Sequence, residues 1–466
     1  MVEFILNNKK ITTDANLAMT LVDFIRENRN LKGTKIVCRE GDCGACSVLV
    51  GELSNDKTSV KYHSITSCIS PLANAQGKHI VTIEGLNIDN KLNIIQQELK
   101  DNYASQCGFC TPGFVVAMVN YCLNAQAEND RHMLDAISGN ICRCTGYVSI
   151  ITAAKKLVEK SRAKSKKFTL EQLVKHGFIP EYFLSIHEKL VKLSQKLPQK
   201  GQNIIAGGTD LYVQQADKLL TTSALRFISL EPKQKITLKD GFCTISAMAT
   251  VTDLFENKEL QKYFPNLQQD LRLLSSQVIR NMATIAGNFV NASPIGDMSV
   301  FFLALDTTLN LVNEDGCHQQ VKLKDFFLDY KKIALKHKQS IDSLIFQLPT
   351  KNSYFNFEKV SKRTHLDIAT VNTAMHLVIE NNDIIQCAIA LGGVAAVPKY
   401  LRKTSRFLCQ KDLSPQTIKA AIAVMQTEIA PISDVRGTAH YKRLLASNLI
   451  KAHFIKLFPE QIKFGV

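Results

Sequence analysis

The chain has 466 residues, so at about 150 residues per domain it is expected to hold about three domains. Apolar residues make up 45% and charged residues 21%, with only 12 Pro and 22 Gly, which excludes disordered, collagen-like and low-complexity proteins. Lys and Arg outnumber Asp and Glu by 57 to 42. This charge of +15 suits nucleic acid, an anionic membrane or an acidic protein partner, and does not choose among them.

The sequence predicts neither a membrane-spanning helix nor a secretory signal. Its longest mostly apolar run, 384–398, is shorter than the ~18 residues that a transmembrane helix needs, and charged residues interrupt the first twenty positions. Nine of the 13 cysteines lie between Cys38 and Cys144. Such clustering without a signal peptide favours metal thiolates in a reducing compartment over disulfides, so we expect a cytoplasmic protein.

The first third of the chain is expected to form a small mixed sheet followed by helices. Residues 2–12 predict a β-hairpin around Asn7-Asn8, and apolar residues between 17 and 25 recur at helical spacing. Further strands are predicted at 47–51 and 80–85. The pattern then becomes helical, at 92–99, 114–121, 133–137 and 150–157, which predicts a bundle of four helices.

A strongly basic stretch, 155–167, separates this bundle from the rest of the chain. We interpret its second half as a linker; a nucleic-acid patch is the alternative, disfavoured because no aromatic residues are interleaved. From Phe168 to about 350, strands and helices alternate as in an α/β domain. The final segment predicts a smaller α+β lobe, with strands at 375–378 and 384–389 and helices at 415–425 and 441–457.

Three cysteines in one short segment have the spacing of a plant-type two-iron cluster. The pattern Cys38-x4-Cys43-x2-Cys46, with Cys68 further along, is typical of [2Fe-2S] binding, whereas zinc ribbons prefer paired C-x2-C knuckles. Two glycines, Gly41 and Gly44, lie inside this loop, where the backbone can turn tightly and aim N–H groups at sulfur. The alternative is a set of buried structural cysteines that share the spacing by coincidence.

A second set of cysteines follows in the helical region. Thr111-Pro112 predicts a helix over 113–125 that starts directly after the first pair, so these thiolates would lie at its positive end. The spacing alone leaves open whether the set binds a second cluster or a zinc ion. The four residues are Cys107, Cys110, Cys142 and Cys144.

The segments Gln106-Cys-Gly-Phe-Cys-Thr-Pro-Gly113 and Gly139-Asn-Ile-Cys-Arg-Cys-Thr-Gly-Tyr147 resemble the iron–sulfur portion of the xanthine dehydrogenase and aldehyde oxidase family of molybdenum hydroxylases. The resemblance implies a β-grasp plant-type ferredoxin domain over 1–86, a four-helix [2Fe-2S] bundle over 87–160 and a linker over 161–175. It also implies that Gln106 touches the pterin of a molybdenum cofactor held by another chain. The sequence departs from the family at Val148-Ser149-Ile150, where relatives commonly have Arg-Pro-Ile. This difference concerns local contacts at the start of the following helix and does not change the implied cluster ligands.

A glycine pair suggests a second cofactor. Asn203-Ile-Ile-Ala-Gly-Gly-Thr-Asp-Leu211 is a strand that runs into two glycines, which would let several N–H groups converge on a pyrophosphate. An ordinary strand-to-helix turn is the alternative. Together with 280–288 and 292–297, the segment resembles the FAD-binding domain of the same family, related to the vanillyl-alcohol oxidase type, and no G-x-G-x-x-G Rossmann fingerprint is present. The resemblance thus implies an α/β FAD-binding domain over 176–350 and an α+β flavoprotein lobe over 351–466, in a multidomain α+β chain.

The resemblance also assigns individual residues to FAD. Asp297 would hold the ribose or adenine side, and Ala286 stands where many relatives have glycine. The full set of implied FAD contacts is Ile204, Ile205, Ala206, Gly207, Gly208, Thr209, Asp210, Leu211, Leu274, Thr284, Ile285, Ala286, Gly287, Asn288, Asp297, Leu344 and Lys359.

A charged loop is the predicted docking place for nicotinamide. Residues 359–363 and 367–369 resemble the family's loop beside the flavin ring, and a solvated charge run between strands is the alternative.

The family's chemistry implies a role for the whole chain. We expect it to pass electrons from a large molybdenum subunit through two [2Fe-2S] clusters to FAD and then to NAD, in a dimer of heterodimers that oxidises purines to urate. Nothing in this sequence resembles the molybdopterin domain, so a partner would supply that cofactor and the purine site. The alternatives are the same role in an aldehyde or N-heterocycle hydroxylase, or a zinc-knuckle protein that binds nucleic acid. The first interpretation predicts no nucleic-acid or membrane partner.

Overall fold

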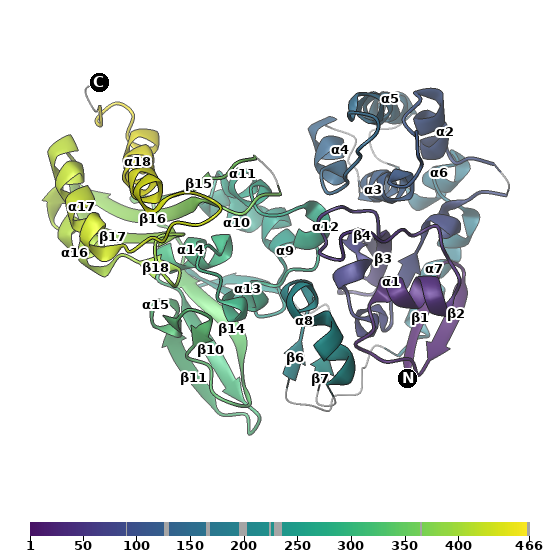
Figure 1. Cartoon of the computed structure of the whole chain (residues 1–466), viewed down its shortest axis with the longest axis horizontal. Coiled ribbons are helices and arrows are strands. Elements are labelled where there is room, and N and C mark those ends of the chain that lie inside the picture. Colours follow the sequence, from purple (N-terminus) through teal and green to yellow (C-terminus); the bar gives the residue numbers. More distant parts are fainter. Residues whose placement is uncertain are drawn as a thin grey trace. The chain divides into compact units, whose positions relative to one another are not determined.

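The computed structural model describes residues 1–89, 91–124, 130–164, 168–194, 203–222, 225–227, 235–363 and 366–463. The chain folds as two compact units (Figure 1). The first unit comprises Met1–Lys233 with Ser276–Ala283, and the second comprises Gln234–Ser275 with Thr284–Val466. The domain boundaries expected from the sequence stay predictions. No helix in the described ranges has the length and apolar character needed to cross a membrane.

The first unit opens with a five-stranded mixed sheet in the order β2-β1-β5-β3-β4. The predicted hairpin is confirmed, with Asn7 in the left-handed region at φ 53°. Strands β1 and β5 are parallel, and the other neighbours are antiparallel. The strands are β1 (Val2–Leu6), β2 (Lys9–Thr13), β3 (Ser47–Leu53), β4 (Val60–Thr66) and β5 (His79–Val81).

Local structure around this sheet differs from the prediction in three places. The helix expected between 17 and 25 is short, with α1 (Leu21–Asp23) continuing into a π-helix over Phe24–Asn28. Strand β4 was not predicted, because its alternation is masked by polar residues on the exposed face. The strand expected over 80–85 ends at Val81 and a 3-10 helix, η4 (Ile83–Leu86), follows.

The predicted bundle of four helices is confirmed. Its members are α2 (Ile94–Asp101), α3 (Thr111–Asn124), α4 (Asp130–Ile137) and α5 (Val148–Lys164). Their apolar residues form one core, to which Phe114, Met118, Ile150 and Leu157 contribute fully buried side chains.

Helices also occupy most of the segment interpreted as a linker. Helix α5 extends to Lys164, and α6 (Leu170–Lys175) begins with a capping box between Thr169 and Gln172. Leu173 packs into the bundle core, so α6 is part of this unit. Residues 165–167 of the expected linker lie outside the described part of the chain. The basic residues of an amphipathic helix produced the linker-like pattern.

The remainder of the first unit packs on the N-terminal sheet. Ile205, Tyr212 and Phe227 join the core of that sheet, and the Tyr212 hydroxyl donates to the Ala18 carbonyl oxygen at 2.7 Å. Strands β6 and β7 pair in parallel. The elements are α7 (Ile186–Val191), β6 (Asn203–Ile205), α8 (Thr209–Thr221), β7 (Leu225–Phe227) and α12 (Gln277–Arg280).

The second unit contains two larger sheets. One has the order β11-β10-β14-β9-β8, and the other has the order β15-β16-β17-β18, with β19 paired to β17. The strands are β8 (Ile236–Lys239), β9 (Phe242–Ser246), β10 (Thr308–Asn313), β11 (His318–Lys322), β12 (Phe327–Asp329), β13 (Lys332–Ile333), β14 (Gln339–Gln347), β15 (Ser353–Val360), β16 (Val371–Glu380), β17 (Asp383–Gly392), β18 (Lys399–Tyr400) and β19 (Lys411–Asp412).

The helices of the second unit include the two predicted near the C-terminus, which are confirmed as α17 and α18. All are α9 (Val251–Glu256), α10 (Lys258–Tyr263), α11 (Leu267–Arg272), α13 (Ile285–Asn291), α14 (Asp297–Ala304), α15 (Leu323–Phe326), α16 (Arg402–Leu408), α17 (Pro415–Glu428) and α18 (Ala439–Leu457).

Opposite faces of the β15–β18 sheet pack against different helices. On one face, Phe355 and Phe357 contact Phe301 of α14. On the other face, residues such as Met375 and Leu377 pack in a core with α16, α17 and α18. Successive residues of a strand point to opposite faces of the sheet. Alternate residues of β15 and β16 therefore pack against α14 or against α16, α17 and α18.

A buried histidine lies between α18 and this sheet. His453 is fully buried, with Nδ1 2.7 Å from Asn356 Nδ2 and Nε2 3.2 Å from Thr373 Oγ1. Burial, followed by the nearby charge of Lys456, lowers its pKa from 6.5 to about 3. The unfolded chain therefore binds a proton below about pH 6.5 that the folded chain does not bind.

We expect this histidine to make the protein less stable in acid. Between pH 7 and pH 5 its contribution to the free energy of unfolding should fall by about 2 kcal/mol. Urea unfolding followed over this range tests the expectation. Between pH 7 and pH 5, the free energy of unfolding of His453→Gln should fall less than that of the wild type. The free energy of unfolding of His440→Gln, which changes an exposed position of the same helix, should fall as much as that of the wild type. Equal slopes in all three chains would contradict it.

Candidate functional site

The first four predicted cluster ligands converge in the N-terminal domain. Cys38, Cys43 and Cys46 lie in the loop before β3, and Cys68 lies in a 3-10 helix, η2 (Ser67–Ile69), directly after β4. Hydrogen-bond contacts join the thiols of Cys38 and Cys43, of Cys46 and Cys68, and of Cys38 and Cys68. The loop turns through left-handed residues, including Gly41 at φ 81°. The structure thus brings all four residues together.

Backbone N–H groups of this loop point at the sulfurs, as predicted. The Glu40 N–H donates to Cys38 Sγ at 3.4 Å, and the Cys43 thiol accepts from the Ala45 N–H. The neighbouring thiols of Cys43 and Cys68, followed by the N–H groups of Glu40 and Cys43, lower the pKa of Cys38 against the effect of burial. Such donors favour the thiolate, which is the form that binds a metal.

The second set also converges, in the helical bundle. Cys107 Sγ lies 3.5 Å from Cys144 Sγ, and a hydrogen-bond contact joins the thiols of Cys110 and Cys142. Burial raises the pKa of Cys110 to about 12. Burial also raises the pKa of Cys142, but hydrogen bonds from the Thr145 hydroxyl and from N–H groups outweigh it, and the pKa is lowered to about 7.

The helix after Cys110 starts earlier than predicted. Thr111 is the first residue of α3 and not its cap, and the Cys110 carbonyl oxygen accepts from the Phe114 N–H at 3.2 Å. Cys110 is therefore at the helix N-terminus, where the helix dipole favours a thiolate.

The donor chemistry of both sets fits a two-iron cluster. Within the described ranges, no group of three or more His, Cys, Asp or Glu side chains is arranged around one metal ion. The thiols of each set contact one another, and a [2Fe-2S] cluster takes two thiolates on each of its two irons. Each set could hold such a cluster through its four cysteines.

The loops that carry the two cysteine sets are in direct contact. The Ile141 N–H donates to the Cys43 carbonyl oxygen at 3.0 Å, and Asn140 Nδ2 donates to the Gly44 carbonyl oxygen at 3.0 Å. Glycine allows this approach: a Cβ on Gly44 would lie 2.3 Å from the Gly139 carbonyl oxygen, and one on Gly113 would lie 2.4 Å from that of Gly44. The sequence pattern did not predict this contact, although each of the two cysteine motifs contains glycine, which permits a close backbone approach.

The second set lies at the surface of the first unit. Cys107 and Cys144 are exposed, as is Gln106. Large apolar residues are exposed nearby in sequence, with Tyr103 86%, Val148 73% and Phe109 42% exposed.

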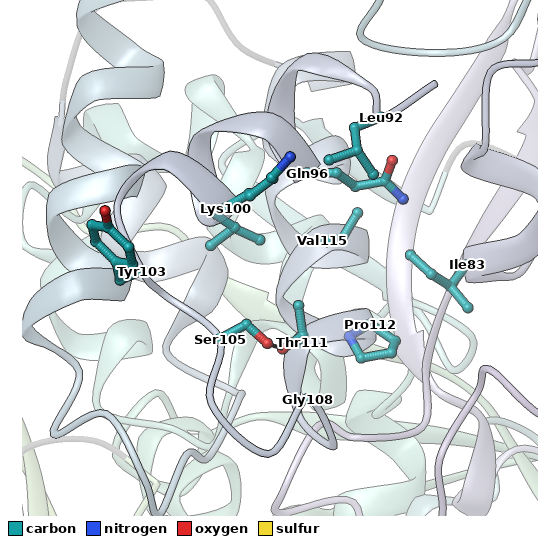
Figure 2. A pocket seen from close by; sticks show the side chains of 11 residues that line it. Ile83, Leu92, Gln96, Lys100, Tyr103, Ser105, Gly108, Thr111, Pro112 and Val115 are labelled. Atoms are coloured by element: carbon teal, nitrogen blue, oxygen red, sulfur yellow. Dashed lines mark hydrogen bonds between the residues drawn. The ribbon is translucent and has the colours of Figure 1, made fainter. Parts of the chain in front are cut away.

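Beside the Cys107–Cys110 loop, a cavity of about 500 Å³ opens between η4, α2 and α3. Figure 2 shows Ile83, Pro112 and Val115 around it, with Ser105 hydrogen bonded to Thr111 at 2.9 Å. This part of the surface is apolar next to exposed cluster ligands.

The residues predicted to bind FAD are divided between the two units. In the first unit, Ile204–Leu211 form the end of β6 and the start of α8. A Cβ on Gly207 would lie 2.0 Å from the Met282 carbonyl oxygen, so this position requires glycine. Gly208, at φ 82°, caps α8 without a side chain. Paired glycines before a helix N-terminus leave the close backbone approach that a pyrophosphate needs.

In the second unit, three polar side chains meet at the start of α14. Lys359 Nζ donates to Asp297 Oδ2 and to the Leu273 carbonyl oxygen, at 2.8 and 2.7 Å. Asn372 Nδ2 donates to Asp297 Oδ1 and, at 3.2 Å, to the Ile295 carbonyl oxygen. Lys359 and Asn372 are direct cross-strand partners on β15 and β16. The Lys359 side chain is only 2% exposed, so the Asp297 carboxylate is held by a buried charge.

The other predicted FAD residues have separate places in the second unit. Thr284 accepts from the Gly287 N–H and caps α13, with Ile285 and Ala286 buried behind it. Leu274 follows directly on Leu273, whose carbonyl oxygen binds Lys359. The Leu344 side chain is fully buried in the middle of β14. Its position therefore does not support the predicted side-chain contact with FAD.

The charged loop predicted to receive nicotinamide is held by one hydrogen bond within the loop and one to Val435. Asp367 accepts from the Arg363 N–H at 2.9 Å, and Lys362 Nζ donates to the Val435 carbonyl oxygen at 3.2 Å. Residues 364–365 of this loop lie outside the described part of the chain. Its role therefore stays a prediction.

Four known domain families match the chain in order. They are a 2Fe-2S iron-sulfur cluster binding domain over 4–73, a [2Fe-2S] binding domain over 82–155, an FAD binding domain in molybdopterin dehydrogenase over 184–349, and a CO dehydrogenase flavoprotein C-terminal domain over 356–457. These matches confirm the predicted fold class and the two iron–sulfur domains followed by an FAD-binding domain.

Full-length similarity extends to larger proteins. The chain is 30% identical to xanthine dehydrogenase of Emericella nidulans over 96% of its length, and 26% identical to aldehyde oxidase 2 of Rattus norvegicus over 99%. It spans 38% and 39% of those proteins. Carbon monoxide dehydrogenase from Hydrogenophaga pseudoflava shares the fold, with a TM-score of 0.51 at 21% identity, covering 56% of this chain and 90% of that one. The chain therefore belongs to the xanthine dehydrogenase and aldehyde oxidase family of molybdenum hydroxylases, as a chain that combines the iron–sulfur and FAD-binding domains.

Proposed function

We propose that the chain is the electron-transfer subunit of a cytoplasmic xanthine dehydrogenase. It would accept electrons from a separate molybdenum subunit that oxidises hypoxanthine and xanthine to urate, and deliver them to NAD. The observation that carries the proposal is the direct contact between the two cysteine loops, one of which includes the exposed Cys144, in a chain that also matches an FAD-binding domain.

The order of sites suits a relay between one-electron and two-electron partners. Bound [2Fe-2S] clusters carry single electrons, and bound FAD collects two and can pass a hydride to NAD. The chain's cysteines hold the clusters and tune them through the Glu40 and Ala45 N–H groups. The glycines before α8 and the Lys359–Asp297–Asn372 group would position the FAD phosphates and ribose.

The apolar surface around Cys107 and Cys144 supports a partner that brings the molybdenum cofactor. Electrons can enter only where a donor comes close to a ligand, and these two cysteines are exposed. Exposed large apolar residues such as Tyr103 and Val148 are typical of a protein interface. Gln106 is exposed, and we include its contact with the pterin on that partner in the proposal. We include a dimer of heterodimers in the proposal, with the charge of +15 favouring an acidic partner.

A second candidate keeps the relay and changes the substrate. The similarity to aldehyde oxidase 2, at 26% identity, favours an aldehyde or N-heterocycle hydroxylase almost as much. Assay of the assembled enzyme with xanthine, an aldehyde and an N-heterocycle, following NADH, separates the two. NADH from xanthine supports the proposal, and NADH only from another substrate supports the second candidate.

Removing one ligand of the second set should remove one cluster. Cys107→Ser should lower iron from about four to about two atoms per chain and abolish one of two electron paramagnetic resonance signals. Cys317→Ser, which changes an exposed cysteine of the second unit, should keep both signals. A wild-type chain that binds zinc and no iron would instead support the zinc-knuckle interpretation.

Breaking the buried ion pair should weaken FAD retention. Lys359→Met leaves the Asp297 carboxylate without its buried partner and should destabilise the protein by about 3–5 kcal/mol. FAD retained through gel filtration, and urea unfolding, measure the two effects. The control is Lys262→Met, which removes an ion pair with 66% and 64% exposed side chains and should cost under about 1 kcal/mol. Full FAD retention by Lys359→Met would contradict the expectation.

A charge placed on the exposed apolar surface should impair assembly. Tyr103→Glu should reduce binding to the molybdenum subunit at least tenfold while leaving the iron and FAD content unchanged, because an interface desolvates the new carboxylate. Surface plasmon resonance with the purified partner measures the affinity. Tyr330→Glu, at a 61% exposed tyrosine of the second unit, should bind like the wild type. Equal affinities of both variants would place the interface elsewhere.

A further inference from the structure

Thr66 is a buried threonine whose hydroxyl makes no hydrogen bond to the residues that the structure describes. It is the last residue of β4, opposite Ser47, and its side chain is fully buried. Among the residues that the structure describes, none lies within hydrogen-bonding distance of its Oγ1 in suitable geometry. Thr66 also precedes η2 at the cap position, yet its hydroxyl does not cap that helix. A buried hydroxyl without a partner is unfavourable, so its presence calls for an acceptor.

The surroundings of this hydroxyl indicate which acceptor it could bind. Thr66 ends β4, the strand that pairs with β3 directly after Cys46, and it lies two residues before Cys68. Its oxygen is packed against the loop between Cys38 and Cys43, because a Cβ built on Gly41 would lie 3.4 Å from it. The hydroxyl is thus enclosed by the segments that carry the first four cysteines.

Two nearby hydroxyls, those of Ser67 and Ser47, are hydrogen bonded, whereas those of Ser64 and Ser70 lack a partner among the described residues, as that of Thr66 does. Ser67 Oγ donates to the Cys46 carbonyl oxygen at 2.6 Å, and Ser47 Oγ donates to the Gly44 carbonyl oxygen at 2.7 Å. Both hold the loop by binding its backbone. Thr66 has no such bond, and none of the four cysteine sulfurs accepts from it either. Its role is therefore distinct from fixing the loop.

We propose that the Thr66 hydroxyl donates a hydrogen bond to an inorganic sulfide of the first [2Fe-2S] cluster and raises the reduction potential of that cluster. This inference rests on the proposed function, since it requires the cluster. A donor at sulfur stabilises the reduced form, which carries one more negative charge, so losing the donor lowers the potential. Thr66 is a positioning and tuning residue and not a ligand.

Redox titration followed by electron paramagnetic resonance tests this on the purified full chain. Thr66→Val replaces the hydroxyl with a methyl group of similar size and should shift the first cluster to a more negative midpoint potential. The second cluster, in the same sample, should keep its potential. Thr66→Ser retains the donor and should stay close to the wild type. Cys122→Ala, at a buried position of the bundle, serves as a control for a general packing effect.

Three outcomes would overturn the inference. An unchanged potential in Thr66→Val would do so, as would a shift in Thr66→Ser as large as in Thr66→Val, because the effect would then come from packing. If Thr66→Val loses the first cluster, Thr66→Ala takes its place, and resonance Raman spectra in H₂O and D₂O provide the second measurement. The Fe–sulfide bands of the wild type should shift in D₂O more than those of Thr66→Ala, and equal shifts would refute the hydrogen bond. A wild type without any [2Fe-2S] signal would instead refute the proposed function.

Discussion

The hydrogen bond from the Ile141 N–H to the Cys43 carbonyl oxygen joins the two cysteine sets, and the electron-transfer half of the molecule depends on it. Residue 43 carries a ligand of the first set, and residue 141 adjoins Cys142, a ligand of the second. Two glycines, Gly44 and Gly113, let the backbones approach so closely that a single added methyl group would collide with a carbonyl oxygen. The relative position of the two sets is therefore fixed by backbone contact, which is stiffer than side-chain packing.

The same principle recurs around the flavin segments. Gly207 approaches the Met282 carbonyl oxygen, and Gly392 faces Asn372 across β16 and β17 so closely that a Cβ would lie 2.1 Å from Asn372 Oδ1. In the second unit the buried Lys359 charge and the Asn372 amide hold both carboxylate oxygens of Asp297. A carboxylate fixed in this way needs no rearrangement to accept a ribose hydroxyl, which is the kind of preorganisation that favours tight cofactor binding.

The two cysteine sets differ in which of their side chains are exposed to solvent. Cys107 and Cys144 are exposed, whereas Cys46 and Cys68 of the first set are buried. The chain spans less than two fifths of the length of the curated relatives that it matches. The exposed apolar residues and the cavity between η4, α2 and α3 lie in the same unit as these exposed cysteines.

The sequence by itself determined the fold class and the order of the iron–sulfur and FAD-binding domains, and it predicted the two sets of four cysteines that the structure brings together, because cysteine spacing and helical periodicity are local properties of the chain. It also identified the glycine pair before α8. Only the tertiary structure decided which side chains meet: the Lys359–Asp297–Asn372 group, the contact of the two cysteine loops and the position of Thr66 each join residues far apart in sequence. It likewise turned the expected linker into helices, since burial of Leu173 in the bundle core outweighs a basic composition. Long-range packing cannot be inferred from a local pattern, because one helix or strand pattern is compatible with many partners.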